Sequence, residues 1–181
     1  MKKIQQIKSK KQVAIIALTR VAFLDIATLL LTIMSVIAYG QNTADFKTAI
    51  HALTNSSNAS DRATAIHMKK MAYELNSTLF IDANGISTSN NDTPICGILE
   101  DTYLSTLYTN NPKFDQLEFI TITVSNPSTI QTLDISLLSH LTSLKYILFV
   151  LRKECTNDQI NQLVKGKNSS VKVYYSIEIP K

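Results

Sequence analysis

Three histidines are the first candidates for chemistry, because an imidazole can ligate a metal ion or transfer a proton near neutral pH. His51, His67 and His140 lack neighbouring ligand residues at a metal-binding spacing. His51 and His67 share a Thr-Ala-Ile-His context, so a metal held between adjacent helices is the alternative to isolated histidines at the surface. We expect isolated histidines, and the sequence predicts no metal site and no cofactor.

Carboxylates are the second candidates, because glycoside hydrolases use facing acid–base pairs. Glu100 and Asp101 are adjacent, and neighbours on the helix expected there point in different directions. Asp82 follows an expected strand and precedes an Asn-Gly pair, which favours a turn-forming role, although catalytic acids also occur at such positions. No nucleophile elbow, phosphate loop or dinucleotide fingerprint occurs. We predict no catalytic residue; a hydrolase would need a site assembled in space, for example from Asp82 and His140.

Cys96 and Cys155 are the two cysteines of the chain. In an oxidising compartment an even pair most simply forms one disulfide, and we predict this bridge. It would close a loop of about 60 residues and stabilise the fold by roughly 4 kcal/mol in the chain-entropy model. The alternative is two buried, unpaired thiols. Neither cysteine lies in a Cys-x-x-Cys motif or another nucleophile context.

The amino-terminal segment, residues 1–40, predicts the compartment. An apolar run over residues 26–38 is shorter than the roughly 20 residues that a spanning helix needs, and it ends in a small-x-small pattern, Ala38 to Gly40. Six basic residues precede it: Lys2, Lys3, Lys8, Lys10, Lys11 and Arg20. We predict a signal peptide over residues 1–40, a mature chain from Gln41, and export to the periplasm or the medium. The alternatives are an uncleaved membrane anchor through residues 23–39 and a cytosolic protein.

Charge narrows the class of partner. The chain carries a net charge of +4, but residues 1–40 hold six of the 18 basic residues and one acid, Asp25. Residues 41–181 then carry 12 basic and 13 acidic residues, a net charge of −1. This balance argues against a nucleic-acid partner. We expect another extracytoplasmic protein as partner, and a membrane only if the leader is uncleaved. The region is long enough for a single α/β domain.

Apolar periodicity predicts the first elements of this domain. We expect amphipathic helices over residues 43–53 and 60–75, the second capped by Ser60. A strand over residues 78–83 should follow, then a polar loop over 86–94 and a third helix over 96–108.

Three extended stretches begin at Leu117, Leu144 and Val171, at a constant period of 27, with helical segments between them. This spacing predicts consecutive βα units over residues 114–179. Residues 144–151 are apolar almost throughout, as in a strand covered on both faces, and residues 171–179 alternate as in an edge strand. At this register Glu118, Lys145 and Lys172 should lie side by side.

Leu117-x-x-Ile120-x-Ile122 and Leu144-x-x-Ile147-x-Phe149 match the Leu-x-x-Leu-x-Leu core of the leucine-rich repeat family. Residues 114–179 therefore resemble that family. The resemblance implies a solenoid whose alternate strand positions form an open, concave binding face. The alternative is a compact parallel-sheet sandwich.

The expected binding face consists of alternate strand residues: Phe119, Thr121, Tyr146, Leu148, Val173 and Tyr175. An exposed patch of this kind would mark an interaction site. The helices of residues 43–75 could instead cover it, and we favour the cover because those helices must bury their own apolar stripes. We expect a small exported, non-enzymatic protein-interaction or scaffolding domain. An extracytoplasmic hydrolase and a membrane-tethered accessory domain are the alternatives.

Overall fold

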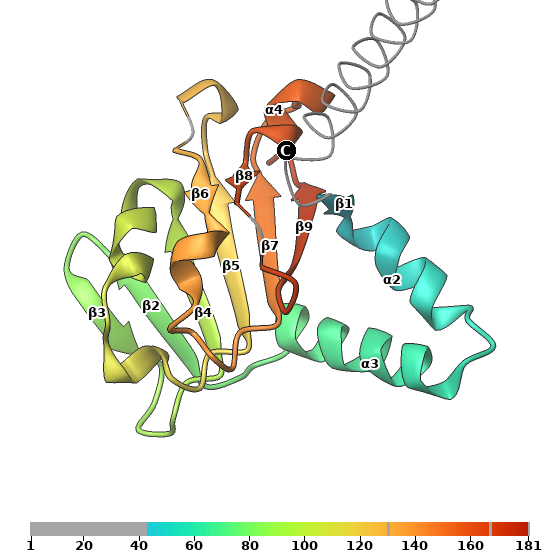
Figure 1. Cartoon of the computed structure of the whole chain (residues 1–181), viewed down its shortest axis with the longest axis horizontal. Coiled ribbons are helices and arrows are strands. Elements are labelled where there is room, and N and C mark those ends of the chain that lie inside the picture. The colour runs from blue at the N-terminus through green and yellow to red at the C-terminus, as the bar shows by residue number, and fades with distance from the viewer. Residues whose placement is uncertain (1–42, 130, 167, 181) are drawn as a thin grey trace, which may run out of the picture. The chain divides into compact units, whose positions relative to one another are not determined.

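The computed structural model describes residues 43–129, 131–166 and 168–180 (Figure 1). The predicted signal peptide and its cleavage site lie outside these residues. Within the described ranges, no helix combines the length and the apolar character needed to cross a membrane.

A seven-stranded sheet organises the fold in the order β1-β9-β7-β5-β4-β2-β3. Its strands are β1 (Ala44–Asp45), β2 (Thr78–Asp82), β3 (Gly85–Thr88), β4 (Cys96–Glu100), β5 (Phe119–Val124), β7 (Tyr146–Leu151) and β9 (Lys172–Ile177). All neighbours are parallel except β2 and β3. From β2 through β4, β5 and β7 to β9 the parallel strands progress across the sheet in chain order. The predicted α/β class is confirmed.

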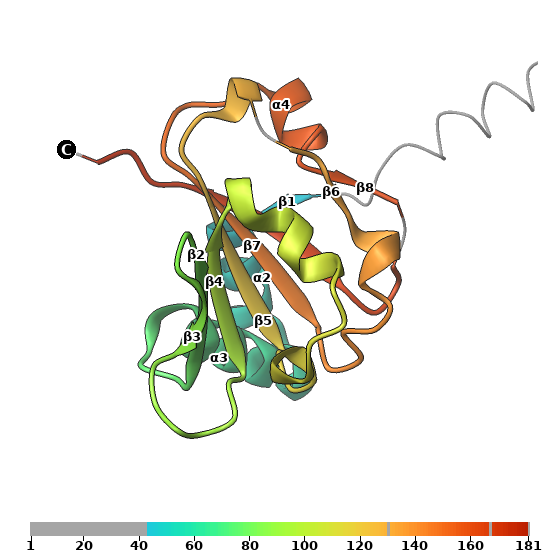
Figure 2. The ribbon, with the colours of Figure 1, turned by 90° about the vertical axis from the view of Figure 1, so that its left-hand side faces the viewer.

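Helices cover both faces of the sheet (Figure 2). The α-helices are α2 (Phe46–Thr54), α3 (Ala59–Tyr73) and α4 (Asn157–Asn161). The 3₁₀ helices are η1 (Asp101–Tyr108), η2 (Pro112–Phe114), η3 (Pro127–Thr129) and η4 (Ile135–Leu138). Two short strands, β6 (Leu133–Asp134) and β8 (Val164–Lys165), form a separate parallel pair. The sequence predicts both α2 and α3, although the Asn58 side chain rather than Ser60 caps α3.

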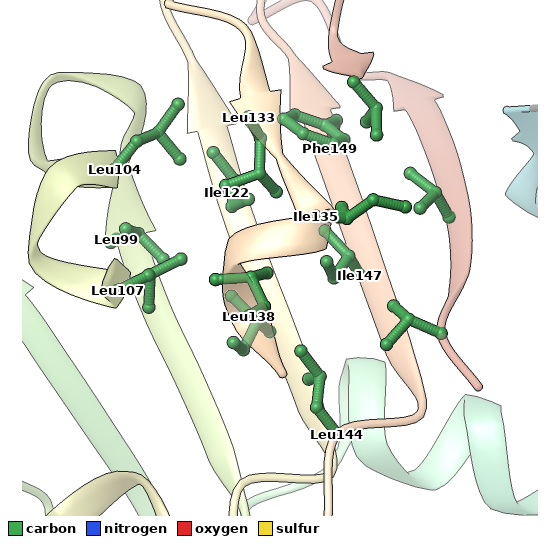
Figure 3. Close-up of a cluster of buried hydrophobic side chains, with 14 of the residues drawn as sticks. Leu99, Leu104, Leu107, Ile122, Leu133, Ile135, Leu138, Leu144, Ile147 and Phe149 are labelled. Atoms are coloured by element: carbon green, nitrogen blue, oxygen red, sulfur yellow. The ribbon is translucent and has the colours of Figure 1, made fainter. Parts of the chain in front are cut away.

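The larger core fills the face that η1 and η4 cover. Leu99, Ile122 and Ile147 point from the strands towards Leu107 and Leu138 of the 3₁₀ helices (Figure 3). These side chains are almost fully buried. Burial of this apolar surface is the main favourable contribution to the stability of the domain.

The smaller core lies under α2 and α3. Phe46 of α2 is fully buried, and its ring makes edge-on contacts with Phe119 and Tyr174, with centroid distances of 6.4 and 5.7 Å. Met68 and Met71 of α3 pack into the same cluster. Aromatic pairs in this geometry add stabilisation beyond the burial of area.

Two predictions over residues 86–108 are wrong. Residues 96–108 form β4 followed by the 3₁₀ helix η1, because Cys96–Glu100 is paired on both sides, with β2 and β5. The predicted loop after Asp82 instead begins with β3, which pairs with β2 as a hairpin. Gly85 adopts a φ of +104° in this turn, which favours glycine.

The constant period expected for the βα units is not maintained across the sheet. Phe119 pairs with Tyr146, as that period requires, but Tyr146 pairs with Lys172 rather than with Val173. A slip of one residue moves every side chain of a strand to the opposite face. Strand β9 is also not the outermost strand, because β1 pairs with it at Tyr174 and Tyr175.

The predicted disulfide is wrong. Cys96 and Cys155 are not bonded. Cys96 begins β4 and is buried in the smaller core, whereas Cys155 follows the end of β7 and packs against the larger core. The two thiols therefore lie on opposite faces and near opposite ends of parallel strands. The Cys96 thiol donates to the carbonyl of Met71 at 3.5 Å, and burial, followed by the charge of Glu118, raises its pKa to about 11.

Candidate functional site

The predicted binding face is divided between the two sides of the sheet. Phe119, Tyr146 and Leu148 lie on the side of α2 and α3, where Phe119 is 0% and Leu148 3% exposed. Val173 and Tyr175 lie on the opposite side, against the larger core. The slip of one residue at β9 explains this division. The expectation that the early helices cover the face is confirmed for the strand positions under them.

The cover is incomplete. α2 and α3 lie towards the β9 side of the sheet, and β2, β3 and β4 lie at the other side (Figure 1). Phe80 of β2 and Ile98 of β4 are a cross-strand pair on the same face, and they are 37% and 39% exposed. Thr121 of β5 follows Ile98 in the same row and is half-buried.

Acidic residues continue this uncovered surface towards the carboxyl ends of the strands. Alternation along β2 and β4 places Asp82 and Glu100 on the same face as Phe80 and Ile98. Thr123 pairs with Glu100 in the next strand. We call the surface formed by Phe80, Asp82, Ile98, Glu100, Thr121 and Thr123 the open sheet face.

The electrostatic character of the open sheet face is negative. Strands β2, β3 and β4 carry no lysine or arginine. Burial raises the pKa of the neighbouring Asp101, and the charge of Glu100 raises it further against two backbone hydrogen bonds that lower it. Asp82 accepts a hydrogen bond from the Asn84 amide at 2.7 Å, as the turn-forming interpretation of this residue predicted.

A hydrogen-bonded group of three ionisable side chains, His67, Glu118 and Lys145, links α3 to the amino ends of β5 and β7. Glu118, just before β5, accepts hydrogen bonds from His67 at 3.2 Å and from Lys145 at 3.0 Å. Burial raises the pKa of Glu118, but the bonds and charges of Lys145 and His67 outweigh it and hold the pKa below its usual value. The predicted neighbourhood of Glu118 and Lys145 is confirmed, whereas Lys172 pairs with Tyr146.

The other candidate residues are dispersed. Asp82 ends β2, whereas His140 precedes β7, so parallel strands keep them at opposite ends of the sheet. The His51 ring forms a hydrogen bond with the Asn55 side chain at 3.0 Å, whereas His67 pairs with Glu118. In the described part of the chain, no three His, Cys, Asp or Glu residues form a group that could hold a metal.

Phe80 and Ile98 are not among the binding residues that the sequence predicts. Strand β2 carries three consecutive apolar residues, Leu79, Phe80 and Ile81, which indicates apolar side chains on both faces. The apolar spacing of residues 96–108 also fits a helix, and that interpretation places Ile98 on its inner face. The signal in the sequence that could have identified Phe80 was this run of apolar residues, which is longer than a strand with one buried face requires.

Comparison of the chain with protein-family models, with curated proteins and with solved structures finds no match. The topology alone therefore defines the class: a mixed α/β domain built on a mostly parallel seven-stranded sheet.

Proposed function

We propose that this protein is a small exported, non-enzymatic interaction domain that binds a protein partner through the open sheet face. One observation carries the proposal: Phe80 and Ile98 lie side by side on adjacent strands and expose more than a third of their surface. Large apolar side chains grouped on an otherwise packed sheet are typical of interaction surfaces.

The charges of this surface define the chemistry of the partner. Asp82 and Glu100 adjoin the apolar pair, and neither forms an ion pair with another described residue. A complementary surface combines aliphatic or aromatic side chains with lysine or arginine at one end. The apolar pair would supply affinity, and the two carboxylates would supply orientation and a faster encounter.

Peptide display tests this proposal with a random library in place of a natural partner. Selection of random peptides on the protein should enrich sequences that combine apolar residues with Lys or Arg. The double variant Phe80→Thr/Ile98→Thr keeps residues suited to strands and should lose at least about tenfold in affinity for the selected peptides. Leu137→Thr, on η4 at the opposite face, is the matched control because Leu137 is also exposed. Undiminished binding by the double variant, or an equal loss in the control, would contradict the proposal.

Export rests on the sequence pattern of residues 1–40. The intact mass of the natively expressed protein tests it, and a mass that begins at Gln41 in the extracytoplasmic fraction is the expected result. A full-length mass in the membrane fraction would favour the tethered accessory domain instead, and a full-length mass in the cytosol would refute export.

A further inference from the structure

The seven-stranded sheet ends in two unlike edge strands, β1 and β3 (Figure 1). Strand β1 has two residues and leads directly into α2, so it offers little edge for further pairing. Strand β3 has four residues in unbroken register with β2, and it contains no lysine, proline or bulge. Short length, charge, proline and bulges are the features by which edge strands avoid pairing with another chain. The β3 edge is therefore the unprotected edge of the sheet.

The outer main chain of β3 carries unpaired hydrogen-bonding groups. The Ser89 amide donates to the Thr78 carbonyl at 2.8 Å, which fixes the direction of the main-chain groups along this ladder. Because that direction alternates in an antiparallel pair, the amides and carbonyls of Ile86 and Thr88 point away from β2. Among the described residues, β3 pairs with β2 alone, and no hydrogen bond reaches these outward groups. One added strand can therefore form four main-chain hydrogen bonds with β3.

The residues of β3 that adjoin the open sheet face are small. Ser87 lies opposite Phe80, Gly85 lies opposite Asp82, and both small residues are exposed. Neighbouring strands lie about 4.8 Å apart, so a strand added to β3 would run about 10 Å from β2. A large side chain opposite Ser87 can cross the serine and contact the Phe80 ring. A long side chain opposite Gly85 can cross the glycine and reach the Asp82 carboxylate.

Charge complementarity specifies the side chain that would lie opposite Gly85. Asp82 and Glu100 end adjacent strands on this face, and among the described residues neither forms an ion pair. Strands β2, β3 and β4 also contain no lysine or arginine that could neutralise them. A basic side chain from the added strand would supply the missing charge, and arginine can form paired hydrogen bonds with a carboxylate.

We propose that β3 accepts the partner as an extended, antiparallel segment with a large apolar residue opposite Ser87 and a basic residue opposite Gly85. The segment therefore reads apolar-x-basic in its own sequence. Ile86 and Thr88 each exchange two hydrogen bonds with the residues that flank the apolar one, and antiparallel pairing is the more stable arrangement. This inference rests on the proposed function, because the open sheet face supplies the contacts of both side chains.

NMR titration of the natively expressed protein with the peptide acetyl-Thr-Val-Leu-Val-Arg-Thr-amide tests the proposal. In the expected register the leucine lies opposite Ser87 and the arginine opposite Gly85, so the amide resonances of Ile86 and Thr88 should shift. N-methylation of either valine removes a hydrogen bond and inserts a methyl group between the strands, and it should weaken binding at least about tenfold. N-methylation of the leucine, whose amide points away from β3, is the matched control and should weaken binding much less.

Two protein variants test the same contacts from the side of β3. Thr88→Pro removes an outward amide, at a kind of edge position where proline is tolerated, and should bind the peptide at least about tenfold more weakly. Its matched control, Thr88→Val, keeps the amide and should bind normally. Asp82→Asn keeps a turn-forming side chain and should weaken the arginine peptide, but not a peptide with norleucine in place of arginine. If Thr88→Pro does not fold, the N-methylated peptides still decide the question on the unmodified protein.

Three outcomes would overturn strand addition at β3. Peptides N-methylated at valine could bind as well as the parent while Phe80→Thr/Ile98→Thr loses binding; the partner would then lie on the open sheet face alone, and the proposed function would stand. Shifts of Ile86 and Thr88 that depend on protein concentration without peptide would show that a second copy of the chain occupies the edge. Absence of binding refutes strand addition, whereas the proposed function fails only if selection of random peptides also yields no ligand.

Discussion

The face of the sheet beneath α2 and α3 has two unlike regions. In the covered region, Phe119 and Leu148 are buried under Phe46 and the methionines of α3. In the open sheet face, Phe80 and Ile98 occupy the same row of the sheet but remain partly exposed. The strands have similar patterns in both regions, so the extent of one helical hairpin determines which apolar residues stabilise the fold and which are available to a partner.

The largest expected effect is a difference in stability between two phenylalanine truncations. Phe46→Ala should lower the free energy of unfolding by about 3–5 kcal/mol, because it leaves a cavity in the smaller core. Phe80→Ala should cost much less, since its ring is partly solvated in the folded state. Urea denaturation of both variants measures the difference. Equal losses would mean that Phe80 is a core residue and would weaken the proposed division of the face.

The reactivity of the Cys96 thiol measures how well α2 and α3 protect the covered region of the sheet. Cys96 lies in the covered region with a pKa of about 11, so at neutral pH its thiolate fraction is about a hundredfold lower than that of an ordinary thiol. Native protein should therefore take up N-ethylmaleimide at Cys155 first, and at Cys96 only after unfolding. Phe46→Ala should accelerate the labelling of Cys96, whereas Phe80→Ala should not. Intact mass after timed labelling distinguishes these cases, and rapid labelling of native Cys96 would show that α3 does not protect it.

A smaller effect on stability is expected at Glu118, which links α3 to the sheet through His67. Glu118→Gln should cost about 0.5–1 kcal/mol of stability at neutral pH, because both partners of Glu118 are largely exposed. The folded-state pKa of Glu118 is depressed, so its contribution is present above its usual pKa of 4.5 and is lost as the pH falls through the lower folded value. The difference in the free energy of unfolding between the two proteins should therefore narrow as the pH falls below 4.5. A difference that does not change with pH would assign the effect to packing.

The smallest effect is expected on the open sheet face. Glu100→Gln removes the charge that helps to raise the pKa of Asp101, so the pKa of Asp101 should fall and the stability should rise slightly. NMR titration of the Asp101 carboxyl measures the first change, and urea denaturation the second. A clear loss of stability would indicate that Glu100 has a structural partner, and would argue against its availability to a ligand.

Local patterns were sufficient for several elements and failed at two, the predicted loop over residues 86–94 and the predicted helix over residues 96–108. The strands that begin near Leu117, Leu144 and Val171 and the helices near residues 43–75 were predicted, because each has a long periodic pattern. Residues 96–108 were not, because Ile98, Leu99 and Leu107 satisfy a helical spacing equally well. Pairing on both sides by β2 and β5 decides in favour of a strand for Cys96–Glu100, and a single-sequence pattern does not contain that information.

The sequence by itself determined the α/β class and the turn at Asp82, since these depend on periodic patterns or propensities close along the chain. The tertiary structure alone decided three other features. The register of β9 placed Val173 and Tyr175 on the opposite face, the two sides of the sheet separated Cys96 from Cys155, and the limited reach of α2 and α3 left Phe80 and Ile98 exposed. Each depends on how segments distant in sequence pair and pack, and a shift of one residue reverses the face on which a side chain lies.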